Sequence, residues 1–168
     1  MKKRGTWRRA AGIGVAAATL LTGVVAGTTA AYADPPVQGS MPRNVANGLC
    51  LDYSAVNNPS HIATFETCDI WNNSEQWSWN PVAGSPGYFQ VRNIIANQCL
   101  YGSPGPYAQV AGCNVADLNQ HWFIPNVNVH PTTITERATG YRLGSVPSSN
   151  KALTGNFQTA NQALWYDT

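Results

Sequence analysis

The chain has 168 residues and holds ten Lys and Arg against eight Asp and Glu, a formal net charge of +2 at pH 7. Half of the basic residues fall within the first nine positions, so residues 34–168 carry five basic and eight acidic side chains, a net charge of −3. That balance excludes a basic patch for nucleic acid or for an anionic membrane surface.

Residues 1–33 combine a basic start, an uncharged run from Ala10 onward and the small-residue ending Ala31-Tyr32-Ala33. This pattern is typical of a secretory signal peptide. The uncharged run is also long enough for an uncleaved membrane anchor, but its Gly and Thr content and the cleavage site favour a signal peptide. General secretion is favoured over twin-arginine export through Arg8-Arg9. We expect a secreted, extracellular protein without membrane insertion.

Residues 34–42 read "DPPVQGSMP", with three prolines and no hydrophobic periodicity. We expect a flexible tail here, and an added edge strand or a docking peptide remain as alternatives. The following residues, 43–168, are enough for one domain with its own core. All four cysteines lie in this part, and outside the cytoplasm they are expected to be paired.

A tryptophan recurs at intervals of 45 and 43 residues, as Trp77, Trp122 and Trp165. Nine residues before these tryptophans stand Cys68, Cys113 and Asn156, respectively. Further back, a residue followed by leucine recurs as Cys50, Cys99 and Arg142, with four extra residues in the first unit. A period of about 43 to 49 residues that occurs three times indicates a threefold internal repeat. The repeats are expected at 43–85, 86–130 and 131–168.

Within the repeats the apolar residues form short runs such as "YFQVRNII" and "HWFIP", bounded by Gly, Pro, Asn and Ser. Such runs predict short β-strands joined by tight turns, and no segment shows a helical period. The domain is therefore expected to be all-β. Trp77, Trp122 and Trp165 occupy equivalent positions, and we expect them to form a common core.

The "CL" near the start of a repeat, a second Cys in its middle and "NQHW" near its end resemble the ricin B-type lectins, β-trefoil carbohydrate-binding modules with QxW repeats. The resemblance covers residues 40–168. It implies a β-trefoil and a disulfide within each of the first two repeats, Cys50 to Cys68 and Cys99 to Cys113. The four cysteines by themselves leave three disulfide connectivities open.

The resemblance also implies a sugar site in each repeat: a carboxylate two residues after the first Cys, an aromatic ring two before the second, and an amide three before the Trp. Carried over, these positions hold Asp52, Glu66 and Ser74, then Tyr101, Ala111 and Asn119, then Gly144, Thr154 and Gln162. No repeat keeps all three residue types. The candidate carbohydrate-binding residues are Asp52, Tyr53, Ser74, Tyr101, Asn119 and Gln120, with Trp71 and Tyr107 as further rings.

Catalytic chemistry has no support in the sequence. The histidines His61, His121 and His130 are isolated, no GxSxG or HExxH motif is present, and the scattered acids single out no glycosidase pair. No CxxC pair indicates zinc, and no cofactor is expected. The sequence thus favours a secreted glycan-binding protein without catalytic activity. The alternative is a protein-binding module, an inhibitor or an adaptor of a secreted complex, whose partner is a secreted or cell-surface protein.

Overall fold

A computed structural model describes residues 39–102, 105–125, 131–146, 148–157 and 160–167. All of them belong to the second of two compact units, Ala31–Thr168. The expected signal peptide and residues 34–38 of the expected tail lie outside the described residues. Within the described ranges, no helix combines the length and the apolar character that crossing a bilayer requires.

The described residues form strands and short 3-10 helices, with no α-helix, which confirms the all-β prediction. The strands are β1 (Pro42–Asn44), β2 (Cys50–Asp52), β3 (Thr64–Glu66), β4 (Trp77–Pro81), β5 (Tyr88–Asn93), β6 (Gln98–Gly102), β7 (Ala108–Gly112), β8 (Trp122–Phe123), β9 (Thr132–Thr133), β10 (Thr135–Glu136), β11 (Arg142–Gly144), β12 (Leu153–Gly155) and β13 (Leu164–Asp167). The 3-10 helices are η1 (Asn73–Glu75), η2 (Leu118–Gln120) and η3 (Ala160–Ala163).

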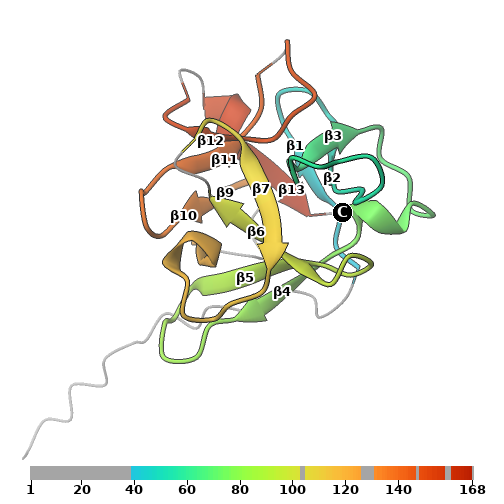
Figure 1. Cartoon of the computed structure of the whole chain (residues 1–168). Helices are drawn as coiled ribbons and strands as arrows, with labels where there is room; N and C mark the ends of the chain where they lie inside the picture. The colour runs from blue at the N-terminus through green and yellow to red at the C-terminus, as the bar shows by residue number, and fades with distance from the viewer. Residues whose placement is uncertain (1–38, 103–104, 126–130, 147, 158–159, 168) are drawn as a thin grey trace, which may run out of the picture. The chain divides into compact units, whose positions relative to one another are not determined.

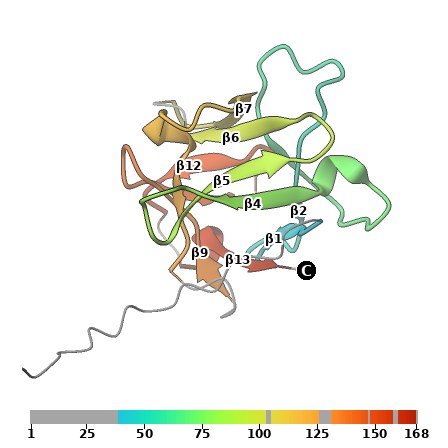
Figure 2. The ribbon, with the colours of Figure 1, turned by 90° about the horizontal axis from the view of Figure 1, so that it is seen from below.

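The strands pair in two antiparallel sheets (Figures 1 and 2). One has the order β3-β2-β1-β13-β9, and the other has the order β12-β11-β10-β8-β5-β6-β7 with β4 paired to β5. Ser40 joins the sheets, because its N–H and C=O bond the backbone of Trp77 in β4 at 3.2 and 3.0 Å. Ser40 and Pro42 are buried, so the prediction of a flexible tail does not hold for residues 40–42.

Three hairpins, β2–β3, β6–β7 and β11–β12, meet through one alanine each. The N–H of Ala63 donates to the carbonyl of Ala108 at 3.0 Å, Ala108 donates to Ala152 at 2.9 Å, and Ala152 returns a bond to Ala63 at 2.9 Å. All three alanines are fully buried. Their small side chains let three backbones approach closely, and the closed ring of hydrogen bonds gives the molecule its threefold centre.

The repeated tryptophans make the same hydrogen bond in each unit. The indole N–H of Trp77 donates to the carbonyl of Leu51 at 2.9 Å, Trp122 to Leu100 at 3.0 Å and Trp165 to Leu143 at 2.9 Å. Each of these six residues is buried, in a core shared by all three units. A buried indole needs a partner for its N–H, and the leucine that follows the first Cys position supplies the carbonyl.

Disulfides join Cys50 to Cys68 and Cys99 to Cys113, which confirms the expected pairing. In the third unit Arg142 pairs with Gly155, as Cys99 pairs with Ala111. This register places Phe157, and not Asn156, at the second Cys position. The third hairpin is one residue longer than the second, and the segment between this hairpin and Trp165 is one residue shorter than its counterpart. The two differences cancel, which is why Asn156 still lies nine residues before Trp165.

Candidate functional site

Asp52 ends strand β2, and its side chain is only 5% exposed. The hydroxyl of Ser74 donates to Oδ1 of Asp52, and the hydroxyl of Thr64, from the paired strand β3, lies 3.4 Å from Oδ2. Because two hydroxyls hold it from two elements, the carboxylate has a fixed direction. The structure thus brings together Asp52 and Ser74, two of the residues that the sequence places in the first site.

Ser74 is held by the start of η1. The side chain of Asn72 caps this helix by accepting the N–H of Ser74 at 3.2 Å, and it also lies 2.7 Å from the Ser74 hydroxyl. The carbonyl of Ser74 accepts the N–H of Tyr53 at 3.1 Å and the side-chain amide of Asn93 at 2.7 Å. An N-cap of this kind fixes the local backbone, so the hydroxyl that orients Asp52 is itself held in place.

Glu75, next to Ser74, is fully buried. Its carboxylate accepts the N–H of Asp69 and the amide of Asn72, both at 2.9 Å. Burial raises the pKa of the Glu75 carboxyl above its ordinary value, the two hydrogen bonds oppose that rise, and the nearby charges of Asp52 and Asp69 add to it. Glu75 therefore ties the chain after Cys68 to η1 and does not face a ligand.

Asp52 lies in a pocket of about 370 Å³ beside the loop formed by residues 54–60. Thr64, Glu66 and Ile62 line it from the β3 side, and Lys151 reaches it from the third unit. The loop contains the four-residue insertion of the first repeat, and Asn58 braces it by two bonds to the backbone of Ile62, at 2.8 and 3.2 Å. Sequence reasoning missed Thr64, Lys151 and this loop, although the insertion was visible in the spacing.

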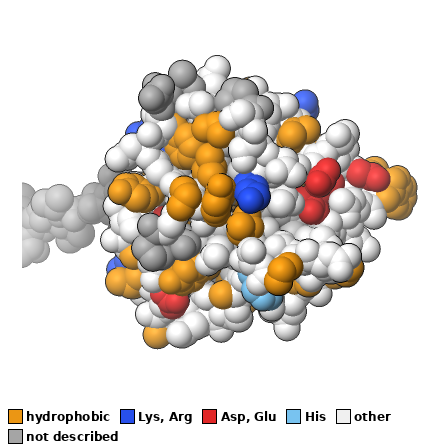
Figure 3. Space-filling view, turned by 45° about the horizontal axis from the view of Figure 1, so that its top comes forward, with side chains coloured by type: hydrophobic (Ala, Val, Ile, Leu, Met, Phe, Trp, Pro, Cys, Tyr) orange, Lys and Arg blue, Asp and Glu red, His pale blue; other side chains and the backbone are white. Residues whose placement is uncertain are grey.

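Uncharged side chains cover much of the surface of the molecule. Charged side chains are sparse on the face shown in Figure 3, where most of the area is white or orange. The loop wall of the Asp52 pocket is likewise uncharged, with Ser54, Val56, Asn57, Asn58 and Pro59. Hydroxyl and amide groups next to small apolar side chains suit a ligand with many hydroxyls and C–H faces.

Tyr53 does not provide a ring at this pocket, because it is only 1% exposed. Its hydroxyl lies 2.8 Å from Nδ1 of His61 and donates to Oε1 of Gln98 at 3.1 Å, which links the first unit to the second. Burial raises the pKa of the Tyr53 phenol. Trp71 is 84% exposed, on the loop that leads to η1. Glu66, at the expected position of the stacking ring, is exposed.

The predicted residues of the second unit are arranged differently. Tyr101 is half-buried in β6, at the position of Asp52. Asn119 is held within η2, where Oδ1 of Asp117 accepts both its N–H and its side-chain amide, at 3.0 and 2.9 Å. Gln120 is 2% exposed. Its Oε1 accepts the N–H of Asn114 at 2.7 Å and its Nε2 donates to Gly112 at 2.8 Å, so its amide is used within the fold.

In the third unit an aromatic ring occupies the space of the missing carboxylate. A Cβ added to Gly144 would lie 2.7 Å from ring atoms of Phe157 and 2.3 Å from the carbonyl oxygen of Gln162. Only glycine allows this approach. A pocket of about 370 Å³ here is lined by Leu153, Thr154 and Gln162, among others. Its chemistry is more apolar than that of the Asp52 pocket.

Metal ligands come together at one point of the described chain, where Cys50, Cys68 and Glu75 lie within 4.8 Å of one another. The two sulfurs form a disulfide, so they offer no thiolate, which is the form that binds metals. These three residues therefore do not fit a zinc or iron site.

No family model and no curated protein compared with the chain matches its sequence. Its structure is similar to the designed threefold-symmetric protein ThreeFoil (14% identity, TM-score 0.64, 77% of this chain and 96% of that one). It is also similar to the Polyporus squamosus lectin bound to a human-type influenza-binding epitope (18% identity, TM-score 0.63, 80% of this chain and 49% of that one). A third similar structure is SeviL bound to asialo-GM1 saccharide (14% identity, TM-score 0.60, 79% of this chain and 98% of that one). At these identities the likeness shows the fold alone, and the chain is a β-trefoil.

Proposed function

We propose that this protein binds a glycan at the Asp52 pocket and does so without catalysis, as a secreted lectin-like protein. The observation that carries the proposal is a carboxylate 5% exposed and held by the hydroxyls of Ser74 and Thr64, in a pocket of about 370 Å³. A fixed carboxylate accepts hydrogen bonds from sugar hydroxyls with little ordering cost. The saccharide ligands named for the Polyporus lectin and SeviL, which share the fold, add support.

The chemistry of the pocket fits recognition of hydroxyls rather than bond cleavage. Asp52 accepts hydrogen bonds from two protein hydroxyls, and the other side chains that line the pocket are uncharged apart from Glu66 and Lys151. A glycosidase needs two carboxyl groups with different proton affinities that flank the scissile bond. The two carboxyl groups of the pocket, Asp52 and Glu66, stand on the paired strands β2 and β3 and so belong to the same wall. The disulfides are compatible with a protein outside the cytoplasm.

A glycan array tests the proposal, with the purified protein beside Asp52→Asn and Asp117→Asn variants. Asp117 caps η2 where Asn72 caps η1, so asparagine is compatible with that position and the second variant removes an equal charge outside the pocket. We expect the wild type and Asp117→Asn to bind the same class of sugar, and Asp52→Asn to lose that binding. Silence of the wild type across the array, or unchanged binding by Asp52→Asn, contradicts the proposal.

Protein binding is a second candidate, and the exposure of one apolar group favours it. Ile70 is 63% exposed, Trp71 84% and Ile95 62%. Gln76 joins their loops, because its side-chain amide donates to the carbonyl of Ile70 at 3.3 Å and its carbonyl accepts the N–H of Ile94 at 3.0 Å. Tryptophan is enriched among the residues that dominate protein interfaces. A stoichiometric partner recovered from culture fluid by the wild type, and lost with Trp71→Ser, would support this function.

A further inference from the structure

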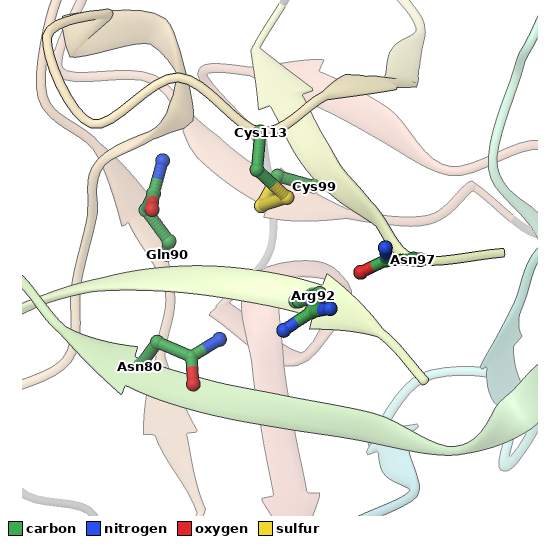
Figure 4. Close-up of a pocket in the computed structure, with 6 residues that line it drawn as sticks. All are labelled: Asn80, Gln90, Arg92, Asn97, Cys99 and Cys113. Atoms are coloured by element: carbon green, nitrogen blue, oxygen red, sulfur yellow. A yellow bond between two sulfur atoms is a disulfide. The ribbon is translucent and has the colours of Figure 1, made fainter. Parts of the chain in front are cut away.

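A third hollow, separate from the Asp52 pocket and from the pocket of the third unit, lies over the strands β4, β5 and β6. Its volume is about 400 Å³, and its walls come from Asn80, Gln90, Arg92 and Asn97 together with the Cys99–Cys113 disulfide (Figure 4). Figure 2 shows these three strands side by side. None of the residues that line it is acidic. The hollow therefore presents one cation among neutral amides.

Strand alternation explains why these side chains share a face. On β4 and β5 the residues Trp79 and Val91 point into the core, at 6% and 0% exposure. Their neighbours point outward, and Asn80 stands opposite Gln90 in the register of the pair. Arg92 follows two residues after Gln90 and pairs with Ser78 on one side and Cys99 on the other. Arg92 thus lies at the centre of the polar face.

Ser78, which pairs with Arg92 across the strands, differs from its counterparts in the other two units. The residue after each repeated tryptophan is Ser78, Phe123 or Tyr166. Tyr166 pairs with Arg43, and Phe123 pairs with Thr135, in the same register in which Ser78 pairs with Arg92. A large ring flanks the equivalent position in both other units. The small hydroxymethyl group of Ser78 leaves the space beside Arg92 open.

Arg92 also differs from its counterpart Arg43 in its hydrogen bonding. Nε of Arg43 donates to the carbonyl of Gly48 at 2.9 Å, which ties that guanidinium to its own turn. In the second unit Asn97 takes the place of Gly48, with a similar positive φ of 54°. Within the described part of the chain, the guanidinium of Arg92 makes no hydrogen bond or ion pair. Figure 4 shows it between the amides of Asn80 and Asn97.

The amides around Arg92 keep acceptors and donors available. Gln90 donates from Nε2 to Oε1 of Gln120 at 3.1 Å, which fixes its side chain and leaves its own Oε1 as an acceptor. Asn80 donates to the hydroxyl of Ser78 at 3.3 Å and keeps its Oδ1. A guanidinium binds a carboxylate through two parallel hydrogen bonds. Amides that both accept and donate match the hydroxyls of a sugar ring.

We propose that this hollow binds a sugar residue that carries a carboxylate, with the carboxylate on Arg92 and the hydroxyls on Asn80, Gln90 and Asn97. A single cation matches one negative charge, and three neutral amides match a group that is otherwise uncharged and rich in hydroxyls. The site goes beyond the proposed function, because it uses none of the residues of the Asp52 pocket and selects acidic saccharides.

Titration of the isotope-labelled protein, followed by backbone NMR, tests this site. The probes are methyl β-glucuronide and the methyl glycoside of N-acetylneuraminic acid, with methyl β-glucoside as the neutral match and acetate as the carboxylate alone. We expect at least one acidic sugar to shift the amide signals of β4 to β6 and to bind about tenfold or more tightly than the glucoside, since charged hydrogen bonds contribute at least that factor. Acetate should bind more weakly than that sugar.

Variants locate the site. Arg92→Gln should weaken binding of the acidic sugar by about tenfold or more. Ser78→Tyr should abolish it by filling the hollow, and a ring is accommodated at the equivalent Tyr166. Arg43→Gln removes the same charge elsewhere and should leave binding unchanged.

Absence of binding by both acidic sugars, equal binding of the glucoside, acetate that binds as well as the sugars, or no effect of Arg92→Gln would each overturn the proposal. Asp52→Asn separates the two sites, since it should leave acidic-sugar binding intact whether or not the Asp52 pocket binds a glycan.

Discussion

The indole N–H of Trp122 donates a hydrogen bond of 3.0 Å to the backbone carbonyl of Leu100, and both residues are fully buried. The same bond occurs in the other two units, between Trp77 and Leu51 and between Trp165 and Leu143. In each unit the bond connects the leucine in the first strand of the hairpin with the tryptophan at or next to the start of the strand that follows the 3-10 helix. The repeat is thus held by an identical polar contact as well as by apolar packing.

Trp122→Phe tests the weight of that contact. Phenylalanine keeps much of the apolar surface but removes the N–H, so the carbonyl of Leu100 is left buried without this donor. We expect the free energy of unfolding to fall by about 1 to 3 kcal/mol. Urea denaturation measures it, with Trp71→Phe as the control, because a side chain that is 84% exposed should change stability by less than about 0.5 kcal/mol. Equal effects of the two substitutions would contradict the interpretation.

Glu75→Gln tests the buried carboxyl of η1. Because burial raises the pKa of Glu75 in the folded state, its neutral form stabilises the fold fully below the unfolded pKa, and that stabilisation is lost as pH rises through the folded value. Glutamine cannot ionise, and Gln120 occupies the equivalent position in the second unit. The unfolding free energy of Glu75→Gln relative to wild type should therefore increase from pH 4 to pH 8. A difference that is constant with pH would show that the carboxyl does not titrate differently on folding.

The two disulfides should contribute similarly to stability. They close loops with sequence separations of 18 and 14 residues, for which the chain-entropy estimate is about 3 kcal/mol each. Cys50→Ala with Cys68→Ala, and Cys99→Ala with Cys113→Ala, should each lower the unfolding free energy by about that amount in denaturant titrations. If one pair proves almost neutral, the loop it closes is held by other contacts, such as the two hydrogen bonds of Asn58 in the first unit.

Ala108→Val tests the threefold ring of alanines. The side chain of Ala108 is fully buried where three hairpins meet. Two extra methyl groups overfill that space, and we expect a loss of about 1 to 3 kcal/mol in unfolding free energy. Ala116→Val, on an exposed turn before η2, provides the control. Thermal unfolding monitored by circular dichroism compares the two, and a loss no larger than the control's would mean that the hairpins separate to admit the larger side chain at little cost.

Local spacing was sufficient to predict three repeated all-β units. The recurrence of Trp77, Trp122 and Trp165 and the short apolar runs predicted three all-β units, because a repeated unit of this length buries its apolar side chains only against its neighbours. The resemblance added the trefoil and the two disulfides, both of which agree with the structure. It also named Asp52 and Ser74 as neighbours, 22 residues apart, because both positions recur at fixed distances from the cysteine and tryptophan.

The character of the sites was decided by tertiary structure. Nothing local distinguishes the buried ring of Tyr53 from the exposed ring of Trp71, because burial depends on which other units cover the side chain. Spacing matched Asn156 with the cysteines, whereas the strand register assigns that place to Phe157.

The sequence by itself therefore determined the repeat, its strands and its core, since these follow from periodic apolar residues that interact at short range. Only the tertiary structure decided the two proposed binding sites. Lys151 reaches the Asp52 pocket from another unit, and Arg92 gains its space from Ser78 on the neighbouring strand β4. The physical reason is that a pocket is formed by side chains brought together across strands, so its shape depends on register and on residues far apart in the chain.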